Sequence, residues 1–344
     1  MKITFRKLAK LALILVYLVI VAGAVVRMTG SGMGCPDWPK CFGYYIPPTE
    51  ASELQWQPES PYKKGQVIIK DETLRVAAKD FISTSSFDET NWQMYTKHDY
   101  AIFNPWHTWI EYINRLFGAL AGLATLALAL SSITYWKKQK RVTIFSWLVV
   151  FGMGFQAWLG ATVVYSVLEP VKITLHMLMA LIIVAILLYI IYRVNNEDKR
   201  IIFDKTTLVL ACFALILTIV QIILGTQVRQ FVDHQIDMVG DTAKRLWLAD
   251  PTWVFYVHRS FSIIVILLNA FLAYRIFKLN LGHVKIVWIL FLLVVEAFSG
   301  MAMYYLDFPF ASQPLHLVVA SILFGVQFYL VLDALKPKTS LNSL

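Results

Sequence analysis

Three histidines lie inside long apolar stretches of this chain: His176, His258 and His316. If such a stretch crosses a bilayer, an ionisable side chain within it is costly and is therefore a candidate functional residue. Histidines on facing helices of a bundle can hold a haem iron through their ring nitrogens. A structural zinc site would need four closely spaced Cys or His ligands, which the sequence lacks. For any one histidine, the alternative is a hydrogen bond to a neighbouring helix.

Short sequence patterns occur twice along the chain, in the same order. The matched segments are Gly23–Arg27 with Gly225–Arg229, Glu111–Arg115 with Phe255–Arg259, Gln156–Gly160 with Glu296–Gly300, and Leu175–His176 with Leu315–His316. Such a repeat indicates two similar units. If the two repeats are parallel, an axis along the membrane normal relates them. We therefore expect an N-terminal half, residues 1–200, and a C-terminal half, residues 201–344.

The two halves differ in the ligands they offer. In the C-terminal half, His258 and His316 could supply both axial ligands of one haem, which makes a six-coordinate iron suited to electron transfer. In the N-terminal half His176 matches His316, but Asn114 stands where His258 would be. An amide is a poor haem ligand, so an iron there would keep the open position that oxygen activation requires. His107, about two helical turns before Asn114, is an alternative ligand or an interfacial histidine.

The N-terminal half also carries an acid that the other half lacks. Glu111 lies one turn before Asn114, and its counterpart is Phe255. Beside a reacting haem, this carboxylate could relay protons or stabilise positive charge; the alternative is an ion pair with Arg115. Glu296 is a further intramembrane acid. Four arginines near the ends of the apolar stretches could bind haem propionates. The alternative is that they snorkel to the membrane interface. They are Arg27, Arg115, Arg229 and Arg259.

The chain has three cysteines. Cys35 and Cys41 share one short segment after the first apolar stretch, where an oxidising outer face would favour a disulfide. That bond would be either a simple staple or a reducible pair that exchanges electrons. Cys212 lies in an apolar stretch, where we expect it to pack. The remaining histidines interpreted as loop residues are His98, His234 and His283.

The elements that would position these residues are membrane helices. Of the 344 residues 58% are hydrophobic and 15% charged, which is too apolar for one soluble core. A membrane-spanning helix needs about 20 mostly apolar residues. Eight segments qualify: Leu8–Met28, Trp109–Tyr135, Val142–Val167, Ile173–Tyr192, Thr206–Val228, Thr252–Ala273, Lys285–Leu306 and Pro314–Leu335. The sequence therefore predicts an all-α membrane protein made of two pseudo-symmetric four-helix bundles, with a long outer loop over residues 29–107.

Basic residues indicate the orientation of these helices. They concentrate before the first span, between spans two and three, four and five, and six and seven, and after the eighth, so we expect both termini in the cytoplasm. These residues include Lys2, Arg6, Lys137, Lys138, Lys199, Arg200, Arg275, Lys285, Lys336 and Lys338. The net charge of +9 is then a topology signal rather than a sign of nucleic-acid binding. With no Arg- and Ser-rich leader, a bacterial plasma membrane is favoured over the mitochondrial inner membrane.

With these residues assembled, the chain resembles the haem A synthase family over nearly all eight predicted helices. The most specific segment runs from Gly23 to Cys41, through Arg27 and Cys35-Pro-Asp-Trp-Pro-Lys-Cys41. Glu111–Arg115 resembles the family's E-Y-x-H-R motif, and Gln156–Ser166 resembles its helix-three motif.

The resemblance implies that the chain oxidises the C8 methyl of haem O to a formyl group, through successive hydroxylation and loss of water. The product, haem A, serves aa3-type oxidases. It also implies haem O as substrate in the N-terminal half, haem b in the C-terminal half, iron ligation by the three histidines and a catalytic role for Glu111. The implied partners are the bilayer, the haem O synthase that supplies haem O, and an electron donor that the sequence does not identify.

One residue departs from the family pattern, since Asn114 stands where the family usually has histidine. Either His176 suffices, or His107 replaces the missing ligand, or the first site is altered. Because Glu111 and Arg115 are retained, we expect a working site with a five-coordinate substrate haem. The competing interpretations are an electron-transfer cytochrome b, a non-catalytic haem-binding assembly factor for cytochrome oxidase, and a transporter.

Overall fold

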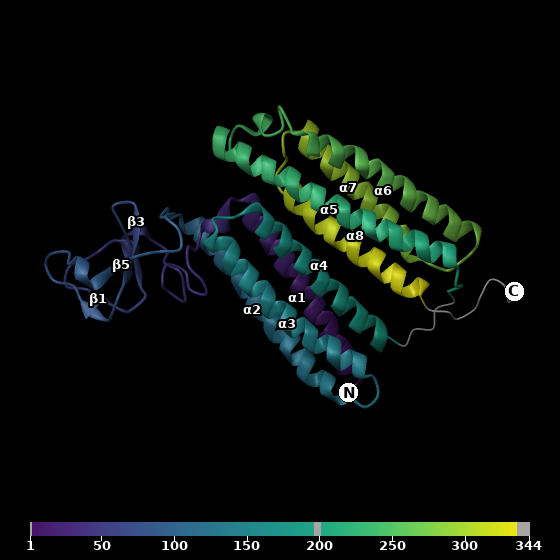
Figure 1. Ribbon diagram of the computed structural model, residues 1–344, viewed down its shortest axis with the longest axis horizontal. Coiled ribbons are helices and arrows are strands. Elements are labelled where there is room, and N and C mark those ends of the chain that lie inside the picture. Colours follow the sequence, from purple (N-terminus) through teal and green to yellow (C-terminus); the bar gives the residue numbers. More distant parts are fainter. Residues whose placement is uncertain (1, 196–200, 336–344) are drawn as a thin grey trace. The chain divides into compact units, whose positions relative to one another are not determined.

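The computed structural model describes residues 2–195 and 201–335. Within these ranges eight helices are long and apolar enough to cross a membrane, as the sequence predicts (Figure 1). They are α1 Lys2–Met28, α2 Pro105–Ser132, α3 Lys140–Tyr165, α4 Pro170–Val194, α5 Lys205–Val239, α6 Trp253–Lys278, α7 Lys285–Tyr305 and α8 Ser312–Ala334. The predicted fold class is confirmed, whereas the side of the membrane on which the termini lie stays a prediction.

Several helices extend beyond their predicted bounds. Both α2 and α4 begin at a proline, Pro105 and Pro170, because the fixed φ of proline suits the first helical turn, where its missing N–H is not needed. The largest difference is in α5, which continues past the predicted end at Val228 to Val239. The prediction that His234 lies in a loop is therefore wrong, since this residue is helical.

The extension of α5 has a packing reason. Val232, Ile236 and Val239 recur at helical spacing and pack in one cluster with Trp247 of the following loop. An apolar face that continues through these residues stabilises the helix beyond the apolar span itself. The helix ends at Gly240, whose φ of 89° leaves the helical region, a conformation that glycine adopts without steric cost.

The long loop between α1 and α2 folds into two small antiparallel sheets. Their strands are β1 Pro61–Tyr62, β2 Val67–Lys70, β3 Thr73–Ala77, β4 Phe81–Ile82 and β5 Trp92–Met94, in the orders β1-β4 and β2-β3-β5. Asp71 and Glu72 join β2 to β3 with φ of 50° and 57°, the positive values that a tight two-residue hairpin turn requires. The sequence predicts a long outer loop here but none of its strands, which are too short for a period-two pattern to stand out.

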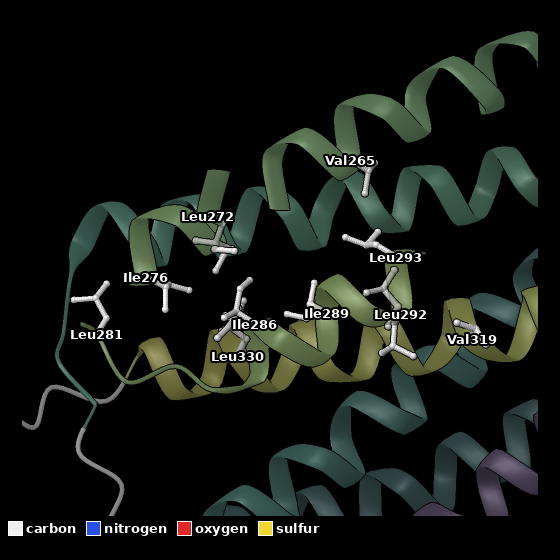
Figure 2. Packing of buried hydrophobic residues seen from close by; sticks show 14 residues of the cluster. Val265, Leu272, Ile276, Leu281, Ile286, Ile289, Leu292, Leu293, Val319 and Leu330 are labelled. Carbon is white, nitrogen blue, oxygen red and sulfur yellow. The ribbon is translucent and has the colours of Figure 1, made fainter. Parts of the chain in front are cut away.

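The four C-terminal helices enclose an apolar core. Helix α5 packs on α6 and α8, and α7 packs on α6 and α8. Fully buried leucines and isoleucines from α6, α7 and α8 meet in this core, among them Leu272, Ile286, Ile289 and Leu330 (Figure 2). Close packing of branched side chains fixes these helices in register.

The described residues divide into two compact units. One comprises Leu18–Leu123 and Phe151–Met177, and the other comprises the described parts of Met1–Tyr17, Ala124–Val150 and Leu178–Leu344. His176 lies in the first unit, whereas His258 and His316 lie in the second. The predicted boundary of the halves, at residue 200, falls outside the described residues, as do the predicted topology charges Lys199, Arg200, Lys336 and Lys338.

Ion pairs join the ends of the C-terminal helices. Arg275 near the end of α6 pairs with Asp204, which caps the start of α5, with 2.9 Å between the charged atoms. Lys285 at the start of α7 pairs with Asp333 near the end of α8 at 2.5 Å. Two of the basic residues expected to orient the chain therefore also connect its helices.

Candidate functional site

Two histidines meet inside the C-terminal helices. His258 on α6 and His316 on α8 have ring centroids 6.4 Å apart, with the ring planes 78° from parallel. Two imidazole nitrogens that each lie about 2 Å from one metal ion place their ring centroids about 6 Å apart. The observed centroid separation is close to this value, so His258 and His316 are a candidate pair of axial ligands for one haem iron.

Each of the three histidines lies against a glycine of a neighbouring helix. A Cβ at the glycine would meet the histidine Cε1 at 3.0 Å for Gly225 and His258, at 3.3 Å for Gly160 and His176, and at 3.6 Å for Gly300 and His316. The absence of a side chain lets the imidazole ring approach the helix backbone. Gly23, the repeat counterpart of Gly225, has nothing within 4 Å of such a Cβ. The contact that His258 makes in the second half thus has no equivalent where Asn114 replaces histidine.

The second ring nitrogens of these histidines have different surroundings. Nδ1 of His316 lies 3.0 Å from Oε2 of Glu296 and 2.8 Å from Oγ of Ser299. The Nδ1 atoms of His176 and His258 are buried without a hydrogen-bond partner among the described residues. Sequence reasoning missed Ser299, although it follows Glu296 by three residues and so shares its helix face.

Two glutamines hold the backbones of the histidine helices. Nε2 of Gln156 on α3 donates to the carbonyl oxygen of His176 at 2.9 Å. Nε2 of Gln221 on α5 donates to that of His258 at 3.0 Å. A polar side chain within a membrane helix needs such a partner. These bonds also hold the backbone from which each histidine side chain projects. Gln221 lies outside the repeated motifs and was not predicted.

In the other unit, Glu111 forms an ion pair with Arg115, four residues further along α2. Arg115 Nη2 lies 2.5 Å from Oε1 of Glu111, and the backbone N–H of Cys35 donates to Oε2 at 2.8 Å. Arg115 also donates to the carbonyl oxygens of Asp37 and Lys40, both at 2.8 Å. Charge-assisted bonds of this kind are strong and geometrically specific. The pair therefore anchors the segment after α1 on α2. The N–H groups of Arg115 donate to backbone carbonyl oxygens of this segment.

The anchored segment carries a disulfide between Cys35 and Cys41. Inside the ring that it closes, the Asp37 carboxylate accepts hydrogen bonds from the backbone N–H groups of Phe42 at 2.5 Å and Gly43 at 2.8 Å. Burial raises the pKa of Asp37 above its ordinary value, and these two N–H groups and the Arg115 guanidinium oppose that rise. Asp37 thus orders the turn that follows the disulfide.

Further contacts fix this segment to its surroundings. The carbonyl oxygen of Pro36 accepts from the Tyr95 hydroxyl at 3.0 Å and from Nε2 of His98 at 2.9 Å. The hydroxyl of Thr108 on α2 donates to the carbonyl oxygen of Gly34 at 2.7 Å. Gly34 lies directly against the α2 backbone, which leaves no space for a Cβ. Tyr95, His98 and Thr108 are residues whose role here no sequence pattern reveals, because their partners are backbone atoms distant in the chain.

The predicted propionate-binding arginines are not alike. Arg229 forms an ion pair with Asp233 in the next turn of α5. Arg259 is exposed on α6, with its guanidinium 5.8 Å from the ring centroid of Phe255 and 5.5 Å from that of Tyr256. Arg229 is therefore held in place, whereas Arg259 rests on aromatic rings through cation–π contacts.

The remaining predicted residues lie at the ends of α1 and α2. Arg27 is in the last turn of α1 and is half-buried. His107 is in the first turn of α2, where its backbone N–H is 3.3 Å from Oδ1 of Asn104. Asn114 is half-buried, and its Oδ1 is buried without a hydrogen-bond partner in the described part of the chain.

Eight membrane helices with a histidine pair at haem spacing define a multi-pass membrane protein with a candidate haem site. The family model of COX15-CtaA, described as cytochrome oxidase assembly protein, matches residues 6–83 and 64–328, and the chain belongs to this family. The predicted family and membrane location are thus confirmed.

Curated bacterial relatives carry the name Heme A synthase. One from Wolbachia sp. subsp. Brugia malayi is 25% identical over 91% of both chains. One from Rickettsia prowazekii is 26% identical over 91% of this chain and 92% of its own. One from Shewanella oneidensis is 27% identical over 63% of this chain and 54% of its own length. The chain is therefore similar to bacterial membrane oxidoreductases of this name over most of its length.

Proposed function

We propose that the protein is a haem A synthase that oxidises the C8 methyl group of haem O to a formyl group. The observation that carries this proposal is the His258–His316 pair, 6.4 Å between centroids, in a chain whose relatives of that name align over about nine tenths of it. A histidine pair of this spacing suits a haem, and the relatives indicate which chemistry the haem supports.

The C-terminal half, residues 201–344, would hold haem b between His258 and His316. A haem with two histidine ligands supplies one-electron transfer. The residues around it orient these ligands. Gln221 holds the His258 backbone, and Gly225 gives the His258 ring its space. Arg229 and Arg259 would bind the propionates.

The N-terminal half, residues 1–200, would take haem O as substrate. His176 would bind its iron from one side, and Asn114 in place of a second histidine would leave the other side open. Oδ1 of Asn114 is a buried acceptor without a donor among the described residues, so it can accept a hydrogen bond from a polar group on the open side. Arg27 would bind a propionate of this haem.

Glu111 would act as a fixed negative charge beside the substrate. Both of its oxygens already accept hydrogen bonds, from Arg115 and from the backbone of Cys35. These bonds hold the carboxylate in one orientation, which suits the stabilisation of positive charge at the reacting carbon. Arg115 would position Glu111 and the disulfide segment rather than bind a propionate.

The reaction itself is a four-electron oxidation. One hydroxylation turns the methyl into a hydroxymethyl group, a second gives a geminal diol, and loss of one water leaves the formyl group. With dioxygen as the oxidant, each hydroxylation would insert one oxygen atom into a C–H bond and release the other as water, which consumes two electrons and two protons. A separate donor would supply these electrons through haem b, and a haem O synthase would supply the substrate. The chain's own contribution is to bind and orient haem O and to exclude water around its methyl group.

The test is to express the protein with haem O, purify it, extract its haems with acid–acetone and identify them by chromatography and mass. We expect haem b together with haem A or a hydroxylated haem O. In Glu111→Gln, oxidised products should fall by at least about a hundredfold, the lower end of the range for loss of one electrostatic group, with haem b retained. Glu72→Gln, at an exposed position of the outer loop, is the control and should leave the products unchanged. Haem b alone, without haem O or its products, would refute the synthase and leave an electron-transfer cytochrome.

A further inference from the structure

The surroundings of His316 differ from those of the other two membrane histidines. Its Nδ1 faces two oxygen atoms of α7: Oε2 of Glu296 at 3.0 Å and Oγ of Ser299 at 2.8 Å. Ser299 is buried, with 6% of its surface exposed. The corresponding nitrogens of His176 and His258 have no partner among the residues that the structure describes.

The hydrogen-bond directions follow from the chemistry of Ser299. Its hydroxyl donates its proton to the backbone carbonyl oxygen of Glu296 at 3.0 Å, and its oxygen then accepts from His316. With Glu296 ionised, its carboxylate also accepts. In this arrangement Nδ1 of His316 carries the ring proton and donates it, which leaves the lone pair of Nε2 for a metal.

The repeat makes this arrangement specific to the second half. Position 156, the counterpart of Glu296, is a glutamine whose amide donates to the backbone of His176 instead of accepting from its ring. The other oxygen of Glu296, Oε1, is buried and has no hydrogen-bond partner in the described ranges. No donor there draws the carboxylate away, and it remains available to the imidazole.

We propose that Glu296, assisted by Ser299, is a positioning residue that orients His316 and lowers the reduction potential of the haem held by His258 and His316. A hydrogen bond from a histidine ligand to a carboxylate fixes the tautomer and makes the ligand more basic. A more basic ligand stabilises the oxidised iron, so this haem becomes the better electron donor. The inference rests on the proposed haem b site and adds the residue that sets its electronic properties.

The experiment measures the midpoint potential of haem b in the purified holoprotein by spectroelectrochemistry. We expect an upward shift in Glu296→Gln, because the amide replaces a charged acceptor, and a smaller upward shift in Ser299→Ala. The low-spin electron paramagnetic resonance g-values, which respond to electron donation by axial imidazoles, should shift in the same order. Glu169→Gln, which removes an acid that pairs with Lys172 at the start of α4, is the control and should leave both readouts at the wild-type values.

The outcomes separate this inference from the proposed function. If the wild-type protein holds no haem b, or if His316→Ala leaves its spectrum unchanged, the haem site itself is wrong. If His316→Ala abolishes the haem b spectrum but Glu296→Gln and Ser299→Ala keep the wild-type potential and g-values, only the role of Glu296 is overturned. Should Glu296→Gln fail to accumulate, Ser299→Ala decides alone, since it removes one acceptor and little volume: an upward shift supports the proposal and an unchanged potential overturns it.

Discussion

The glycines that face His258 and His316 allow a matched test of the proposed haem b site. Replacing Gly225 by alanine would place a methyl carbon 3.0 Å from Cε1 of His258, whereas the same change at Gly300 would place it 3.6 Å from Cε1 of His316. Ordinary carbon–carbon contacts lie at about 3.5–4.0 Å. The first substitution therefore overlaps its histidine by about half an ångström, and the second does not overlap.

The expected magnitude follows from the overlap alone. Replacing glycine by alanine inside a helix gains about 1 kcal/mol, but this gain is the same with and without haem and cancels in the affinity. Overpacking costs about 1–3 kcal/mol, and it acts on haem binding because an iron-bound His258 cannot move away. At 1.4 kcal/mol per tenfold change, haem b affinity of Gly225→Ala should fall by about 5- to 100-fold. Gly300→Ala has no overlap and should keep its affinity.

The assay is the rate and extent of haem transfer from each purified variant to an acceptor protein in excess. Haem content on purification, measured against protein, provides a second readout. Equal haem loss in the two variants, or a greater loss in Gly300→Ala, would refute the argument that the His258 ring depends on close approach to Gly225.

Three further predictions concern the unit that comprises Leu18–Leu123 and Phe151–Met177. Arg115→Lys keeps the charge but loses the planar guanidinium that donates to the disulfide segment. The free energy for opening that segment should therefore fall by about 1.5–3 kcal/mol, which is measured as faster hydrogen exchange. Unchanged exchange would contradict the anchoring role. Because burial raises the pKa of Asp37, the folded segment binds this proton more tightly than the unfolded one, and its stability should fall as pH rises from the ordinary value of 3.8 through the folded pKa. The measurement is the proteolysis rate of the segment over that pH window. In Asp37→Asn the contribution of this carboxyl group to the pH dependence of the rate should disappear. Asn114→His should convert haem O bound at His176 from high-spin to low-spin absorption, and a wild-type spectrum already fully low-spin would count against the open position.

The membrane helices could be predicted because their signal is local. A run of about 20 apolar residues is costly in water wherever it occurs, so all eight helices were found from composition alone. The errors lie where tertiary contacts prolong a helix. Val232 and Ile236 extend α5 because they pack against Trp247 of another segment, and nothing within the run itself indicates that partner. The short strands of the outer loop were missed for the same reason, since each is stabilised by its pairing.

The candidate site was predictable in part. An ionisable residue in an apolar run stands out by type, so the sequence singles out His176, His258 and His316 as candidates, together with Glu111. Their partners were not predictable in full. The ion pair with Arg115 has helical spacing and was foreseen as an alternative, but the bond from the Cys35 backbone to Glu111 joins atoms 76 residues apart. No periodicity carries information on such a contact.

Residue type and spacing in this chain determine that it enters a membrane, how many helices it forms, which side chains are costly enough there to require a function, and that its two halves repeat. These properties depend on transfer from water to lipid, which each segment undergoes by itself. The fold alone decides that the rings of His258 and His316 lie 6.4 Å apart, that Glu296 meets His316, and that Arg115 holds a distant loop. Those arrangements depend on packing between helices, because hydrogen bonds between remote residues form only where the packed backbone brings donor and acceptor together.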